Sequence, residues 1–181
     1  MSLGSRRKAR ALALQVLFAR DGGGGGEAAS ADEAVTSYGE RFELDVDPLA
    51  REFAQVLVRA ATVDPAAIDR AIGAASRNWR LERMARVDRN ILRLAAGELL
   101  HVPETPIRVV INEAVELAKR FGTAESAAFV NGVLDRVAHG LERHDAPGGD
   151  GEPADGGEAG EGGAGAVSGD DGAGDGRGPG G

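Results

Sequence analysis

Prolines that directly follow a residue with a side-chain oxygen divide this chain into separate helices. Asp47-Pro48, Asp64-Pro65 and Thr105-Pro106 each place a capping oxygen at an N-cap and a proline in the first turn, where the missing N–H has no intrahelical partner. Gly122-Thr123 combines a helix stop with the next N-cap. These signals predict helices at about residues 5–20, 32–43, 48–61, 65–74, 82–101, 106–121 and 124–143.

The spacing of the apolar residues agrees with these helices. In the first one, apolar residues recur every three or four positions, at Ala9, Leu12, Ala13, Val16 and Leu17. The helices predicted at 82–101, 106–121 and 124–143 have the same spacing, and no segment alternates apolar and polar residues as a strand does. The predicted fold class is therefore all-α, with short loops that favour antiparallel neighbours.

The charge of the chain is unevenly distributed. Residues 145–181 contain nine Asp or Glu and one Arg, whereas residues 1–144 contain 20 charges of each sign. The acidic balance of the whole chain therefore does not exclude nucleic-acid binding by the helical part. Because 16 of the last 37 residues are Gly, we expect the tail at 144–181 to be disordered. We also expect the glycines at 22–26 to form a flexible surface loop.

Several functional classes are excluded by what the sequence lacks. Cysteine is absent, so disulfides and thiolate metal sites are excluded, and a reducing cytoplasm is the expected location. No apolar run approaches the length of a membrane span, and Gln15 and Arg20 interrupt the pattern of a signal peptide. His101, His139 and His144 lack metal-binding spacing, and no nucleophile motif is present. We predict no catalytic residue, no metal and no cofactor.

A basic cluster opens the first predicted helix and consists of Arg6, Arg7, Lys8 and Arg10. Like charges on one helix repel each other, and these also oppose the positive end of the helix dipole. Helical spacing places Arg7 on one stripe with Leu14 and Phe18. Cations beside a ring suit single-stranded RNA, because the cations bind phosphates and the ring stacks on bases. From the cluster alone, a solvated helix start is the equal alternative.

Several other residues have either a structural or a functional interpretation. Phe129 lies about 110° from the centre of the last helix's apolar stripe, so it is either a second helix contact or a stacking or partner-contact residue. Glu116 and Arg120 have the spacing of a surface ion pair, and Glu113 is expected to cap or to pair internally. We expect Trp79 to fill a core between subdomains rather than to stack on a base. The nearby arginines either pair with acidic neighbours or extend the basic surface; they are residues 77, 80, 83, 86 and 89.

Three segments resemble the NusB family of transcription antitermination factors: RRKARALALQVLF, VDRNILRLAAGEL and INEAVELAKRFGTAESAAFVNGVLD. The similarity spans about residues 5–142. It implies an all-helical fold of two antiparallel subdomains, here about 1–75 and 76–143. It also implies binding to the boxA element of ribosomal RNA leader transcripts, together with the small-subunit ribosomal protein that doubles as NusE, within the antitermination complex of RNA polymerase.

The resemblance also implies roles for individual residues. Arg6, Arg7, Lys8 and Arg10 match the family's arginine-rich RNA-binding start. Phe18 stands where the family commonly has Tyr, and Phe121 and Phe129 belong to the RNA face. Asp88 and Glu125 match positions that face NusE. This sequence departs from the family pattern at Gly97, where an aromatic is commoner, and in its glycine-rich loop and acidic tail.

Two functions fit these observations. The first is an RNA-binding adaptor for antitermination, in which the acidic tail is either inert or competes weakly with RNA for the basic cluster. The second is a helical interaction module that works without RNA, because some family members bury the basic face in a homodimer. A similar helical domain precedes the methyltransferase domain of certain ribosomal RNA methyltransferases. No catalytic motif follows residue 143, so we predict that the chain is not an enzyme.

Overall fold

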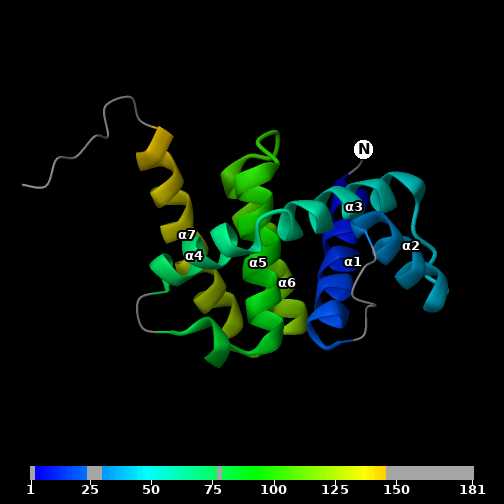
Figure 1. Ribbon diagram of the computed structural model, residues 1–181, viewed down its shortest axis with the longest axis horizontal. Helices are drawn as coiled ribbons and strands as arrows, with labels where there is room; N and C mark the ends of the chain where they lie inside the picture. Colours follow the sequence, from blue (N-terminus) through cyan, green and yellow to red (C-terminus); the bar gives the residue numbers. More distant parts are fainter. Residues whose placement is uncertain (1–2, 24–29, 77–78, 146–181) are drawn as a thin grey trace, which may run out of the picture. The chain divides into compact units, whose positions relative to one another are not determined.

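The computed structural model describes residues 3–23, 30–76 and 79–145 of the 181-residue chain. In these ranges the backbone forms α-helices and one short 3-10 helix and contains no strand, which confirms the all-α prediction (Figure 1). The elements are α1 (Leu3–Asp21), α2 (Ala31–Arg41), α3 (Pro48–Thr62), α4 (Pro65–Ala75), η1 (Leu81–Arg83), α5 (Arg86–His101), α6 (Ile107–Phe121) and α7 (Ser126–Asp145). The tail expected to be disordered, from residue 146 on, and most of the expected glycine loop lie outside the described residues. No described helix is both long and apolar enough to span a membrane.

The helix starts follow the capping residues in two of four predicted cases; the N-cap predicted at Thr123 is wrong, because α7 begins at Ser126. The Oδ1 atoms of Asp47 and Asp64 each accept a hydrogen bond of 2.9 Å from the backbone N–H three residues later. The prediction for Thr105 is wrong: Pro106 occupies the N-cap of α6, and no side chain caps that helix. Ser30 and Glu33 form a capping box at the start of α2. The spacing of these two residues is readable in the sequence.

The helix predicted at 82–101 is interrupted near its start. Residues 81–83 form the separate turn η1, and α5 begins at Arg86. Met84 between them has an extended backbone, with φ −71° and ψ 146°, and its side chain is buried. The extended residue turns an apolar side chain into the core, so tertiary packing overrides the continuous helical pattern of the sequence.

The centre of the fold is α5, which packs against α1, α3, α4, α6 and α7 (Figure 1). Its apolar residues join those of the surrounding helices in one continuous core, whose fully buried large side chains include Leu57, Ile68, Ile72, Ile91, Leu92, Leu94 and Leu134. The division into subdomains near residues 75 and 76 stays a prediction. It coincides with the end of α4 at Ala75.

Gly97 sits where α5 crosses α3 at very short range. A Cβ atom at this position would lie 2.8 Å from the Cα of Ala61 and 2.9 Å from the carbonyl oxygen of Ala60. Both atoms belong to the backbone of α3 and cannot rotate away. The departure from the family pattern at Gly97 therefore has a packing reason: any larger residue would push the two helices apart.

A polar network ties the end of α1 to α4 and α5. Asp21 accepts hydrogen bonds from Arg89 Nη2 at 2.7 Å and from Asn90 Nδ2 at 3.1 Å. Arg93 binds Asp69 with two hydrogen bonds of 2.8 Å. Burial alone would raise the pKa of Asp21, but the hydrogen bonds from Arg89 and Asn90 and the nearby positive charges bring that pKa below its usual value. The carboxylate is therefore ionised at neutral pH.

Candidate nucleic-acid interface

Three of the four predicted cations lie at the surface of α1, each in a different setting. Arg7 is 63% exposed and binds Glu113 of α6 through Nε at 3.2 Å and Nη2 at 2.8 Å. Lys8 is exposed. The Arg6 guanidinium is half-buried and lies 4.9 Å from the ring centroid of Phe53 on α3. The first turns of α1 therefore present Arg7 and Lys8 to solvent, with Arg6 beside them.

Arg10 does not belong to this surface, contrary to its prediction as an RNA contact. Its side chain is 3% exposed and forms two hydrogen bonds with Glu98 of α5, which is 1% exposed, at 3.0 and 2.5 Å. The sequence gives no sign of this pair, because the two residues are 88 positions apart. Arg10 is neutralised inside the core, so we omit it from the proposed RNA-binding residues.

Acidic residues of α6 lie beside the exposed cations. Glu113 pairs with Arg7, which confirms the expectation that Glu113 pairs internally. Glu116 binds Lys119 at 2.7 Å, so the predicted pair with Arg120 is wrong. The hydrogen bond from Lys119 and its charge lower the pKa of Glu116, and the hydrogen bond to Glu113 raises the pKa of Arg7. An RNA phosphate that reaches Arg7 therefore competes with a neighbouring carboxylate.

An apolar cavity lies at the other end of the same stripe of α1. It has a volume of about 320 Å³ and is lined by Leu14, Gln15, Phe18, Ala19, Tyr38, Phe42, Val87 and Phe121. The predicted RNA-binding residues Phe18 and Phe121 thus meet at one site, whereas Phe129, the second predicted stacking ring, does not line this cavity. Arg7 lies 11 residues before Phe18 on α1, or about 16 Å along the helix axis. Sequence reasoning missed Tyr38 and Phe42, although two aromatics four residues apart signal a shared helix face.

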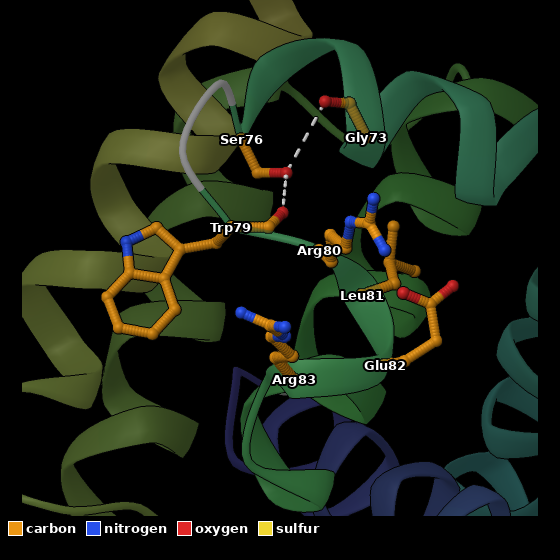
Figure 2. Close-up of a pocket in the computed structure, with 7 residues that line it drawn as sticks. All are labelled: Gly73, Ser76, Trp79, Arg80, Leu81, Glu82 and Arg83. Atoms are coloured by element: carbon orange, nitrogen blue, oxygen red, sulfur yellow. Dashed lines mark hydrogen bonds between the residues drawn. The ribbon is translucent and has the colours of Figure 1, made fainter.

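Trp79 and Phe129 form a second surface. Trp79 also lines a wide pocket of about 890 Å³ (Figure 2). The ring centroids of Trp79 and Phe129 are 6.0 Å apart in an edge-on arrangement. Trp79 is 59% exposed, so the prediction that it fills a core is wrong. The Ser76 hydroxyl donates a hydrogen bond of 2.9 Å to the Trp79 carbonyl and fixes the backbone there. Figure 2 shows the guanidinium of Arg83 directed toward the Trp79 side of the pocket.

The two predicted partner-binding residues differ in exposure. Glu125 is exposed just before α7, and its Oε2 accepts a hydrogen bond of 3.0 Å from the Thr123 hydroxyl. Asp88 is 8% exposed on the first turn of α5, and its Oδ1 has no hydrogen-bond partner among the described residues. The next residue, Arg89, donates to the carbonyl of Leu81 in the wall of the Trp79 pocket. Asp88 is thus the sequence neighbour of a residue that contacts the wall of this pocket.

The comparisons with known proteins agree on one family. A model described as the NusB family matches residues 7–139. The transcription antitermination protein NusB of Sorangium cellulosum is 52% identical over 143 residues, covering 79% of this chain and 98% of that protein. Its counterpart in Anaeromyxobacter dehalogenans is 48% identical over 136 residues, covering 75% of this chain and 92% of that protein.

Solved structures show the same likeness. The NusB of T. maritima superposes with a TM-score of 0.64 at 37% identity, over 74% of this chain and 90% of that chain. A crystal structure of the antitermination factors NusB and NusE in complex with dsRNA matches with a TM-score of 0.65 at 27% identity, over 77% of this chain and 99% of that chain.

Proposed function

Because the chain belongs to the NusB family of transcription antitermination proteins, we propose that it binds the boxA element of ribosomal RNA transcripts in the cytoplasm and supports their transcription. The observation that carries this proposal is the arrangement on α1 and α6. Exposed Arg7 and Lys8 stand at one end of α1, and an apolar cavity with Phe18 and Phe121 opens at the other. This is the combination that single-stranded RNA requires.

In this mechanism the exposed cations neutralise phosphates and the rings stack on unpaired bases. Arg7 exchanges its contact with Glu113 for a phosphate, and Lys8 adds a second mobile cation. Phe18 and Phe121 supply stacking, which contributes about 1–3 kcal/mol per base. No bond of the RNA is made or broken, so the protein acts as an adaptor and not as an enzyme.

NusE is the proposed protein partner, and the surface around Phe129 and Trp79 is its proposed docking site. Glu125 offers an exposed carboxylate there, and Asp88 offers an Oδ1 acceptor that lacks a partner. A buried acceptor without a hydrogen bond is costly, so a donor from NusE that reaches Asp88 would stabilise the complex. The related crystal structure that contains NusB, NusE and RNA supports an assembly of this composition. We propose that this assembly joins the antitermination complex of RNA polymerase.

Titration of a short single-stranded RNA that carries boxA, with and without NusE, tests the proposal. We expect Arg7→Glu and Lys8→Glu each to weaken binding at least tenfold. Arg70→Glu is the matched control, because Arg70 is an exposed cation on α4 and should change the affinity by less than threefold. A scrambled RNA should bind more weakly than boxA.

A different outcome would favour the second function. If the wild-type protein does not bind boxA, alone or with NusE, and sediments as a dimer at micromolar concentration, the RNA-binding proposal fails. The basic cluster would then belong to a contact between two copies of the chain.

A further inference from the structure

Arginines lie over three of the aromatic rings that line the apolar cavity. The distances from guanidinium carbon to ring centroid are 4.0 Å for Arg86 over Phe18, 6.0 Å for Arg41 over Phe42 and 4.9 Å for Arg120 over Phe121. The arginines come from α5, α2 and α6, and all three are exposed. Among the described residues, none of their guanidinium groups forms an ion pair. Three cations without carboxylate partners therefore surround one apolar opening.

One aromatic ring of the cavity lining, that of Phe42, is largely in contact with water. Phe42 is 53% exposed, although phenylalanine is among the residue types that are most often fully buried. It packs against Tyr38 at a centroid distance of 4.6 Å and an interplanar angle of 42°. Gln15 adds an amide to the otherwise apolar and aromatic lining. An amide can both donate and accept hydrogen bonds, so it can contact the polar edge of a flat, aromatic ligand.

The size and charge of the site select its occupant. A volume of about 320 Å³ is at the lower end of the range for small-molecule pockets. That volume suits one planar ring system, whereas the apolar face of a partner helix needs a long groove. The surrounding arginines require an occupant that carries negative charge on both sides of its ring. One nucleotide within an RNA strand has this chemistry, because a phosphate flanks the base on each side.

We propose that the cavity holds a single unstacked base of the bound RNA, and that Arg41, Arg86 and Arg120 hold the phosphates on either side of it. This inference rests on the proposed function and deepens it. It assigns RNA contacts to Tyr38 of α2, to Phe42 at the C-cap of that helix and to the three arginines. The RNA path then continues from Arg7 and Lys8 along α1 to the mouth of the cavity.

A boxA RNA series with 2-aminopurine at successive positions tests the assignment. We expect one position to lose fluorescence on binding, because its base stacks on the rings. Phe42→Ala should abolish that signal and weaken binding roughly tenfold to hundredfold. Leu49→Ala is the matched control, since Leu49 is an apolar residue with the same exposure of 53%, and it should leave both readouts unchanged.

The arginines have a test of their own. Arg86→Gln should weaken binding severalfold and reduce the slope of log K against log salt by about 0.7, the contribution of one phosphate contact on a single strand. Arg70→Gln should leave this slope unchanged. Both surface substitutions are expected to preserve the thermal unfolding midpoint, which verifies that the variants are folded.

The outcomes separate this inference from the proposed function. If the wild-type protein does not bind boxA RNA, both fail. If it binds, and Arg7→Glu weakens binding while Phe42→Ala and Arg86→Gln change neither the affinity nor the fluorescence, only the base pocket is refuted. If the cavity variants lose NusE and keep RNA, the occupant is a protein segment, and the base pocket is refuted as well.

Discussion

Replacing Arg10 by methionine removes one half of the buried ion pair and keeps an unbranched side chain. Arg10 and Glu98 are 3% and 1% exposed, so this variant leaves the Glu98 carboxylate without its cation inside the core. Removing one partner of a buried pair costs about 3–5 kcal/mol. That is a large part of the roughly 5–15 kcal/mol by which a domain is stable. We expect the midpoint of thermal unfolding to fall by roughly 10 °C or more.

Removing both charges should have a much smaller effect. In the double variant Arg10→Met, Glu98→Leu, neither charge has to be transferred from water into the core, and apolar side chains of similar size fill the space. Such replacements are often neutral or stabilising. The double variant should therefore unfold near the wild-type midpoint. The difference between the double variant and the sum of the single variants measures the coupling between the two residues.

The role of Arg10 is tested on four proteins: the wild type, Arg10→Met, Glu98→Leu and the double variant. Each is measured by thermal unfolding, followed by circular dichroism, and by titration with boxA RNA. We expect the double variant to bind RNA within about twofold of the wild type, because the exposed cations of α1 are unchanged. A double variant that folds normally but binds RNA tenfold more weakly would show that Arg10 reaches the RNA. The assignment of Arg10 to the core alone would then be wrong.

The remaining predictions use the same folded protein. Asp21→Asn should cost on the order of 1 kcal/mol of stability at pH 7; because folding lowers the pKa of Asp21, the wild-type advantage should disappear as the pH falls below about 4, as measured by urea unfolding. Gly97→Ala should destabilise the fold by about 1–3 kcal/mol or more, because its Cβ meets the α3 backbone. Gly140→Ala, which meets no atom within 4 Å, should stabilise α7 slightly. Lys8→Gln should reduce the salt slope of RNA binding by about 0.7, and an unchanged slope would remove Lys8 from the interface. Deletion of residues 145–181 should tighten RNA binding at low salt if the acidic tail competes for the basic cluster, and an unchanged affinity would show that the tail is inert.

Most helix boundaries could be predicted because their signals are local. Asp47 and Asp64 cap helices from within one turn of the chain, and Gly122 ends α6 at the expected place. The prediction failed where distant packing decides the backbone. Met84 breaks a continuous helical pattern because the core takes up its side chain, and Thr105 does not cap α6 although its side chain is suitable.

The candidate site could be predicted only in part, because side-chain partners come from distant segments. Phe18 of α1 and Phe121 of α6 lie far apart in the sequence and meet at one cavity. Trp79 is an aromatic residue of the kind that usually fills a core, yet it is 59% exposed. Single-sequence reasoning treats four neighbouring cations as equivalent. In the structure their surroundings differ: Arg6 lies over Phe53 of α3, Arg10 pairs with Glu98 of α5, and Arg7 pairs with Glu113 of α6.

The ion-pair partner of each arginine on α1 determines how much that arginine can contribute to RNA affinity. Arg10 is neutralised by Glu98, and Arg7 is already paired with Glu113. Arg7 therefore contributes only the difference between a phosphate contact and a carboxylate contact. The net electrostatic attraction of α1 is smaller than its sequence indicates, so charge alone gives little selectivity and modest affinity. At the far end of the helix, arginines rather than carboxylates lie over the rings of Phe18, Phe42 and Phe121. Base stacking there must supply a substantial share of the binding free energy.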